Sequence, residues 1–134
     1  MIRSAVHLLA VLTAGAVVGT LSGCSEKNDS STPGVAVDAG DDTCAVEKTT
    51  FDAGPITFDV TNSGSDVTEV YVYGEKDGHF SQIVDEVENI GPGTSRELDV
   101  DLEAGRYHVT CKPGMVGDGI ATMITVKADA DKAP

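Results

Sequence analysis

Several segments of this chain alternate apolar and polar residues with a period of two, and this alternation restricts the fold more than any other feature. Segment 97–102 alternates acidic with aliphatic residues, and segment 56–61 alternates apolar with polar residues. Successive side chains of a β-strand point to opposite faces, so each such segment places one face in a core and the other in water. No segment shows the i, i+3, i+4 apolar spacing of an amphipathic helix. The pattern therefore predicts an all-β protein.

Gly-rich turns separate the alternating segments at regular intervals. Segment 85–90 is ambiguous, because it fits a short helical turn as well as an irregular connection. The clearest predicted strands lie at 56–61, 67–73, 80–84, 98–102, 106–111 and 120–126. About seven short strands joined by such turns indicate a β-sandwich.

The first 23 residues have the composition of a secretory signal peptide. Arg3 precedes an apolar run at 8–18, which is shorter than the ~20 apolar residues that a bilayer span needs. The residues Leu21-Ser22-Gly23-Cys24 resemble the lipobox of bacterial lipoproteins, in which the Cys becomes the lipidated N-terminus. We therefore expect cleavage after residue 23, lipidation of Cys24, and anchoring on the extracytoplasmic face of the cell membrane.

Residues 24–42 follow the expected cleavage site and are rich in Ser, Asp and Gly, without apolar periodicity. This composition predicts a flexible tether, with the folded domain at 43–134. Loss of Arg3 with the signal peptide takes the formal net charge from −13 to −14. Such a charge repels nucleic acid and anionic lipid headgroups, and it favours cations or basic protein surfaces as partners.

Three cysteines are present, and Cys24 is assigned to the lipid. Cys44 and Cys111 remain in a compartment where disulfides persist. They either pair with each other as a disulfide or bind a metal ion together, and the residues alone leave both options open.

Segment 107–115 joins a strand that ends at Cys111 to a Pro-Gly loop that carries Met115. In blue-copper sandwiches such a loop supplies a thiolate, a His and a weak axial Met, and an earlier strand adds a second His. Here no His lies between Cys111 and Met115. His108 should point to the opposite face of the strand from Cys111, and His79 lies in a predicted turn. A type 1 copper centre is therefore not expected, although the Cys-x3-Met spacing makes Met115 a candidate ligand.

The chain resembles the cupredoxin-like domain of EfeO, the exported component of a ferrous-iron uptake system. The most specific part is the run Glu-Asn-Ile-Gly-Pro-Gly at 88–93, with one Cys on each side of it. The resemblance covers about residues 35–127 and is carried by Cys44 and by segments 53–62, 68–70, 88–96 and 107–111. It implies a cupredoxin-like Greek-key sandwich that handles iron or copper outside the cytoplasm. EfeO proteins usually carry a second, helical domain that has no counterpart here, so we expect a free-standing module.

Carried over by position, the family's metal site implies Cys44, Glu69 and Cys111 as ligands. Thiolates suit copper or zinc, and added carboxylates suit iron. Glu69 lies in the apolar segment 67–73, where a charge that faces inward needs a partner; alternatively it faces water beside two tyrosines. Glu88 is a further candidate ligand, and Glu86 with Glu88 forms a candidate secondary cation site.

We find no nucleophile elbow, zinc-protease motif or P-loop, so we do not expect an enzyme. We expect a membrane-tethered, extracytoplasmic cupredoxin-like protein that binds iron or copper in uptake or handling, with an iron permease or another envelope protein as partner. The alternative is an immunoglobulin-like lipoprotein, stapled by a Cys44–Cys111 disulfide, that acts as a protein-interaction module.

The lipobox makes a direct prediction for Cys24. The substitution Cys24→Ala removes the atom that accepts the lipid, so metabolic labelling with a fatty acid should fail and membrane-bound protein should be lost. Cys44→Ala, which changes a cysteine outside the motif, should be labelled as the wild type is. Equal labelling of Cys24→Ala and wild type would contradict the assignment.

Overall fold

The computed structural model describes residues 33–130. The predicted signal peptide, the lipidation site Cys24 and the first part of the predicted tether lie outside these residues. No helix long and apolar enough to cross a membrane occurs between residues 33 and 130. The strands are β1 (Val35–Ala39), β2 (Cys44–Val46), β3 (Thr50–Asp52), β4 (Gly54–Asn62), β5 (Thr68–Lys76), β6 (His79–Ile90), β7 (Ser95–Leu102), β8 (Gly105–Pro113) and β9 (Ile120–Lys127).

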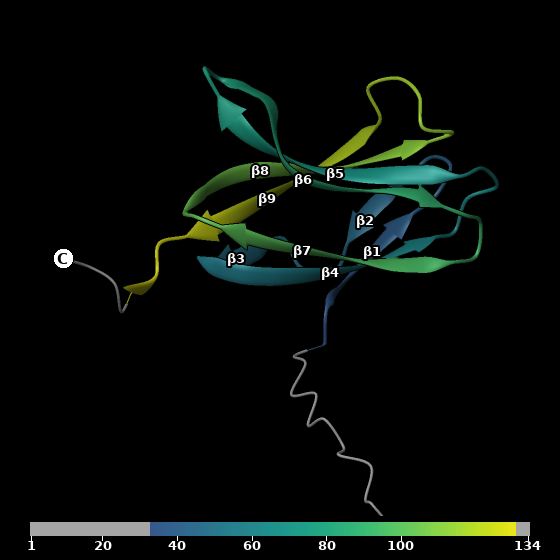
Figure 1. Cartoon of the computed structure of the whole chain (residues 1–134). Helices are drawn as coiled ribbons and strands as arrows, with labels where there is room; N and C mark the ends of the chain where they lie inside the picture. Colours follow the sequence, from purple (N-terminus) through teal and green to yellow (C-terminus); the bar gives the residue numbers. More distant parts are fainter. Residues whose placement is uncertain (1–32, 131–134) are drawn as a thin grey trace, which may run out of the picture. The chain divides into compact units, whose positions relative to one another are not determined.

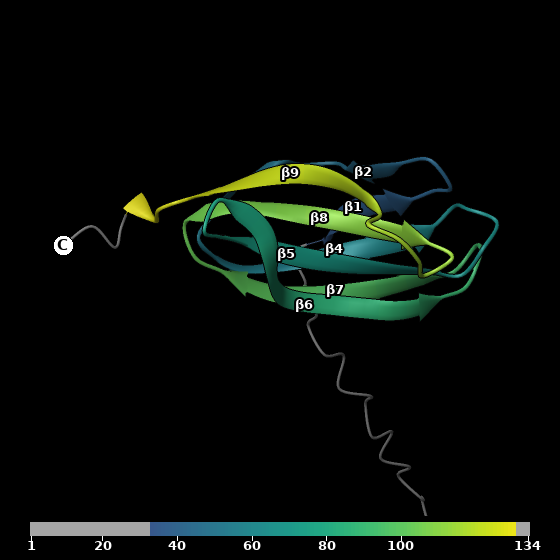
Figure 2. The same ribbon diagram turned by 90° about the horizontal axis from the view of Figure 1, so that it is seen from above.

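These strands form two packed sheets, as Figures 1 and 2 show from two directions. The four-stranded sheet has the order β2-β1-β4-β7, and the five-stranded sheet has the order β3-β9-β8-β5-β6. Most neighbours are antiparallel, but β1 pairs with β4 and β3 pairs with β9 in parallel. The predicted all-β, two-layer architecture is therefore confirmed.

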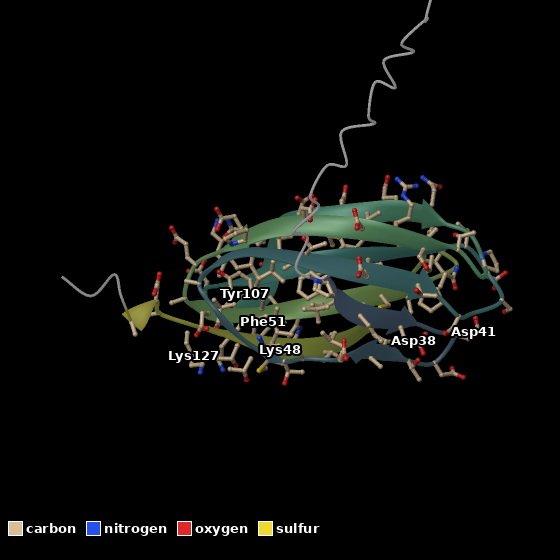
Figure 3. The ribbon with its side chains drawn as sticks, turned by 90° about the horizontal axis from the view of Figure 1, so that it is seen from below. Asp38, Asp41, Lys48, Phe51, Tyr107 and Lys127 are labelled. Carbon is tan, nitrogen blue, oxygen red and sulfur yellow. A yellow bond between two sulfur atoms is a disulfide. The ribbon has the colours of Figure 1, made fainter. Side chains whose placement is uncertain are left out.

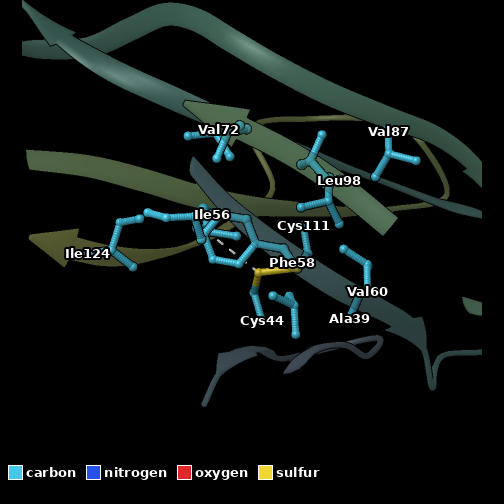
Figure 4. Close-up of a cluster of buried hydrophobic side chains, with 14 of the residues drawn as sticks. Ala39, Cys44, Ile56, Phe58, Val60, Val72, Val87, Leu98, Cys111 and Ile124 are labelled. Atoms are coloured by element: carbon cyan, nitrogen blue, oxygen red, sulfur yellow. Dashed lines mark hydrogen bonds between the residues drawn. A yellow bond between two sulfur atoms is a disulfide. The ribbon is translucent and has the colours of Figure 1, made fainter. Parts of the chain in front are cut away.

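Aliphatic and aromatic side chains from both sheets fill the space between the layers. Phe58 on β4 and Val72 on β5 are fully buried, and Phe51 meets Phe58 edge to face with ring centroids 5.9 Å apart. The alternation predicted for 97–102 holds, since Leu98, Val100 and Leu102 are buried while the acidic residues between them are exposed. Figure 4 shows Phe58 at the centre of this cluster.

Hydrogen bonds from two side chains hold the connections between strands. The amide of Asn62, which is 1% exposed, donates to the carbonyls of Asp66 and Ile90, both at 2.8 Å. The hydroxyl of Tyr107 donates to the carbonyl of Glu103 at 2.9 Å. This contact resembles the tyrosine corner that closes a strand connection in Greek-key sandwiches.

The β5–β6 hairpin and the β8–β9 loop rise from the same side of the five-stranded sheet, as Figure 1 shows. The hairpin turns at Asp77 and Gly78, whose φ values of 53° and 81° are both positive. Such a two-residue turn favours Asp-Gly. The β8–β9 loop folds back tightly at Gly119, where an added Cβ would lie 2.6 Å from the carbonyl oxygen of Cys111.

One disulfide joins the two layers. Cys44 on β2 and Cys111 on β8 are bonded, with their Cα atoms 5.5 Å apart. Both residues are buried, at 4% and 0% exposed, and the bond lies beside Phe58 in Figure 4. The disulfide therefore ties a three-residue edge strand to the centre of the opposite sheet.

The structure differs from the sequence-based prediction at three places. β1 lies within residues predicted as tether, so the domain begins before residue 43; Val37 and Ala39 are buried, and β1 pairs with β4 along its whole length. The short strands β1, β2 and β3 raise the count from about seven to nine. The ambiguous segment 85–90 continues strand β6, whose irregularities are register shifts against β5 rather than a helical turn.

The disulfide predicts a large change in stability. Its loop spans 67 residues of sequence separation, so its loss should lower the free energy of unfolding by about 4 kcal/mol on the chain-entropy model. Denaturant unfolding of Cys44→Ala/Cys111→Ala against wild type measures this difference, and thiol titration of unreduced, denatured wild type should show that neither Cys44 nor Cys111 reacts. Two reactive thiols, or equal unfolding midpoints, would contradict the role of the disulfide.

Candidate functional site

The disulfide removes both cysteines from the predicted metal site in this state of the protein. The metal-binding form of cysteine is the thiolate, and neither sulfur of a disulfide is one. Cys111 also points into the core, because its partners across the ladders are Val70 on β5 and Ile120 on β9. Of the two options left open by the sequence, the structure contains the disulfide.

Glu69 lies on the opposite face of the sheet from Cys111. The β5–β8 register pairs Val70 with Cys111 and Glu69 with Lys112, so Glu69 and Cys111 differ in parity and point to opposite sides. The predicted trio of Cys44, Glu69 and Cys111 therefore does not converge on one ion. Glu69 therefore does not face inward: it lies on the outer face, on the side of Tyr71 and Tyr73, although it is only 6% exposed.

Tyr71, Glu69 and Glu86 are neighbours on the outer face of the five-stranded sheet. Tyr71 follows Glu69 by two residues on β5, and the β5–β6 register places Glu86 directly opposite Tyr71. Burial of the ring raises the pKa of the Tyr71 hydroxyl, and the negative charges of Glu69 and Glu86 raise that pKa further. We call these three residues the Tyr71 cluster.

The other two predicted ligands, Met115 and Glu88, lie outside strands β2 and β8. Met115 is in the loop after β8 with a φ of 56°, and its backbone N–H donates to the carbonyl of Lys112 at 2.9 Å. Glu88 is exposed on β6, beside the left-handed residue Asn89. Between residues 33 and 130, no three His, Cys, Asp or Glu side chains are placed to hold one metal ion.

A copper site built from a thiolate and imidazoles does not fit these residues. Cys111 is in the disulfide, and His108 lies on the outer face, where its ring stacks on Phe80 at 3.7 Å between centroids. His79 is exposed at the start of β6. The buried Thr68 hydroxyl has no hydrogen-bond partner, but one hydroxyl oxygen is not the sulfur and nitrogen donor set that copper selects.

Aromatic and basic side chains share the outer face of the five-stranded sheet with the Tyr71 cluster. The rings of Tyr71 and Tyr73 stack at 5.3 Å, and the Nζ atom of Lys112 lies 4.4 Å from the Tyr71 centroid. Arg106 binds Glu75 with an N···O distance of 2.7 Å. Burial lowers the pKa of His108, which favours the neutral imidazole.

The sequence contained a signal for this face that its interpretation did not use. If Cys111 faces inward, then His108, Thr110 and Lys112 should all lie on the outward face of the strand, because successive side chains alternate between faces. The structure agrees with this, because the β5–β8 ladder pairs His108 with Tyr73, Thr110 with Tyr71 and Lys112 with Glu69. The partners of these residues on β5 and β6 depend on long-range pairing, which the sequence alone does not reveal.

A match to a family model agrees with this architecture. The family model of the cupredoxin-like domain matches residues 11–126. Among solved structures, the chain is similar to dithionite-reduced auracyanin from the photosynthetic bacterium Roseiflexus castenholzii. The two share 16% sequence identity with a TM-score of 0.49, over 68% of this chain and 94% of that chain. No curated protein sequence matches.

The two-sheet sandwich and a family match over most of the sequence lead to one conclusion. This chain belongs to the cupredoxin-like domain family.

Proposed function

We propose that this protein is a lipid-anchored, extracytoplasmic cupredoxin-like protein that binds iron through oxygen ligands of the Tyr71 cluster, in metal uptake or handling. It holds the ion as cargo and catalyses no reaction. The resemblance to the EfeO cupredoxin-like domain supports iron as the cargo and an iron permease or another envelope protein as the partner. The cysteines, which that resemblance implies as ligands, serve here as a structural brace.

The observation that carries the proposal is the burial of Glu69 without a salt bridge, although Lys112 lies opposite it on β8. Glu69 is 6% exposed, and it forms no salt bridge with another residue between 33 and 130. A buried carboxylate is costly unless it is paired or coordinates a metal. The Tyr71 hydroxyl carries one proton, so it can donate a hydrogen bond to only one of the two neighbouring carboxylates at a time. A bound cation would interact favourably with both carboxylates.

The donor chemistry of the Tyr71 cluster favours iron over copper. Carboxylate and phenolate oxygens are hard ligands, whereas copper selects thiolate, thioether and imidazole. The pKa of Tyr71 is raised, mainly by burial and then by Glu69 and Glu86, so the phenol keeps its proton when no cation is bound. A bound cation reverses this local electrostatic effect and displaces the proton. Binding therefore releases a proton and should strengthen as the pH rises.

The acidic surface supports the same function. The outer face of the four-stranded sheet carries Asp59, Glu97 and Asp99, and Figure 3 shows Asp38 and Asp41 at the end of β1 on this side. Summed negative charge raises the local concentration of cations and speeds their capture. An anchor at Cys24 would keep the captured ion close to the membrane.

Ferric iron supplied as a citrate chelate tests the proposal. Binding through Tyr71 should produce a visible phenolate-to-iron charge-transfer band with one equivalent of iron, and Tyr71→Phe should abolish the band. Glu69→Gln should weaken iron binding at least about tenfold, because it removes a charged ligand. Tyr73→Phe is the matched control, since it removes a hydroxyl from the adjacent stacked ring and should leave the band unchanged.

The second candidate function is a protein-interaction module without a metal. The disulfide favours it, because it leaves a braced sandwich whose two thiols are not free. In the same titration, wild-type protein that binds no iron while remaining folded would exclude the iron proposal and leave this candidate. A band that survives Tyr71→Phe would show that iron binds elsewhere.

A further inference from the structure

A recess of about 400 Å³ opens on the outer face of the five-stranded sheet. Phe80 and Ser81 line it from the start of β6, and Asp118 lines it from the β8–β9 loop. Both segments rise from this sheet in Figure 1, and strand β8 adds His108, Thr110 and Lys112 to the lining of the recess. Its volume is within the range of small-molecule sites.

Aromatic rings form the apolar part of the recess. Tyr73, Phe80 and His108 all line it, and the rings of Phe80 and His108 are stacked with an interplanar angle of 14°. Tyr73 is held in place by its stack on Tyr71. Burial lowers the pKa of His108, so its imidazole is neutral at neutral pH and adds no charge to this wall.

Polar groups of balanced charge surround the rings. Lys112 and Asp118 bring one positive and one negative charge, and Ser81 and Thr110 bring hydroxyl groups. Thr110 is only 3% exposed, and it lines the recess from strand β8. The Thr110 hydroxyl can therefore donate a hydrogen bond to a ligand in the recess and accept one from it.

We propose that this recess binds one ring of a neutral saccharide. A sugar ring has an apolar C–H face, which fits against the electron-rich face of an aromatic ring, and a rim of hydroxyl groups that both donate and accept hydrogen bonds. Asp118 and Lys112 supply an acceptor and a donor, and Thr110 and Ser81 supply both. The opposite charges of Lys112 and Asp118 give no preference for an ion, and the net charge of −13 for the whole chain repels polyanionic glycans.

The saccharide proposal does not depend on iron binding. Glu69 and Glu86 do not line the recess. Glu69→Gln should therefore leave saccharide binding unchanged, and Thr110→Val should leave the ferric charge-transfer band unchanged. Failure of one proposal is thus distinguishable from failure of the other.

Titration of the ¹⁵N-labelled full chain with cellobiose tests the inference by NMR. Amide shifts should be confined to strands β5, β6, β8 and the β8–β9 loop, with a dissociation constant in the millimolar range that is usual for such small contacts. Thr110→Val keeps the shape of the side chain and should weaken binding by about tenfold, because it removes one buried hydrogen bond. Thr125→Val, on the same sheet but outside the recess, is the matched control and should bind as wild type does.

Sorbitol serves as the ligand control, because it carries similar hydroxyl groups without a ring face. Saccharide binding at the recess predicts shifts with cellobiose and none with sorbitol. No shifts with cellobiose, equal shifts with both compounds, or equal binding by Thr110→Val and wild type would overturn the inference. Because Thr110→Val preserves volume and Thr125→Val reports on the same sheet, a loss caused by unfolding would be visible in the spectra.

Discussion

The disulfide between Cys44 and Cys111 fixes how every other residue of β8 is used. It pulls Cys111 into the core against Val70, and the two-residue period of the strand then sends Thr110 and Lys112 to the outer face. The sulfur atoms hold the layers together, and the neighbouring residues supply donors and acceptors to the surface. The same short strand segment thus contributes to stability on one side and to the candidate sites on the other.

The two outer faces of the sandwich differ in chemistry. The four-stranded sheet presents mainly carboxylates and hydroxyls, because β7 alternates aliphatic residues with Glu97, Asp99 and Asp101. The five-stranded sheet presents stacked rings, Lys112 and the buried Glu69. The carboxylates of the first face are exposed to water, whereas the buried carboxylate of Glu69 on the second face is the group for which we propose a ligand.

The sequence predicted the sandwich well, because alternation over 56–61 and 97–102 reports directly on which face is buried. It missed β1 and extended the tether too far, because Asp38 and the surrounding Gly and Asp residues hide the alternation of Val35, Val37 and Ala39. For the site, composition indicated that Glu69 is unusual within an apolar strand. It did not indicate that Glu69 and Cys111 face opposite ways, because that depends on the register between β5 and β8. The partnership of Tyr71 with Glu86 likewise arises from long-range pairing with β6.

We assign Cys44 and Cys111 to a structural disulfide and propose an oxygen-ligand site on the other face of the sheet. X-ray absorption spectroscopy at the iron edge of the loaded protein tests this separation most directly. We predict a first coordination shell of oxygen atoms only, since carboxylates and a phenolate supply the proposed ligands. A sulfur atom in the first shell would show that Cys44 or Cys111 opens to bind the metal, and it would contradict the assignment of the disulfide as a permanent brace.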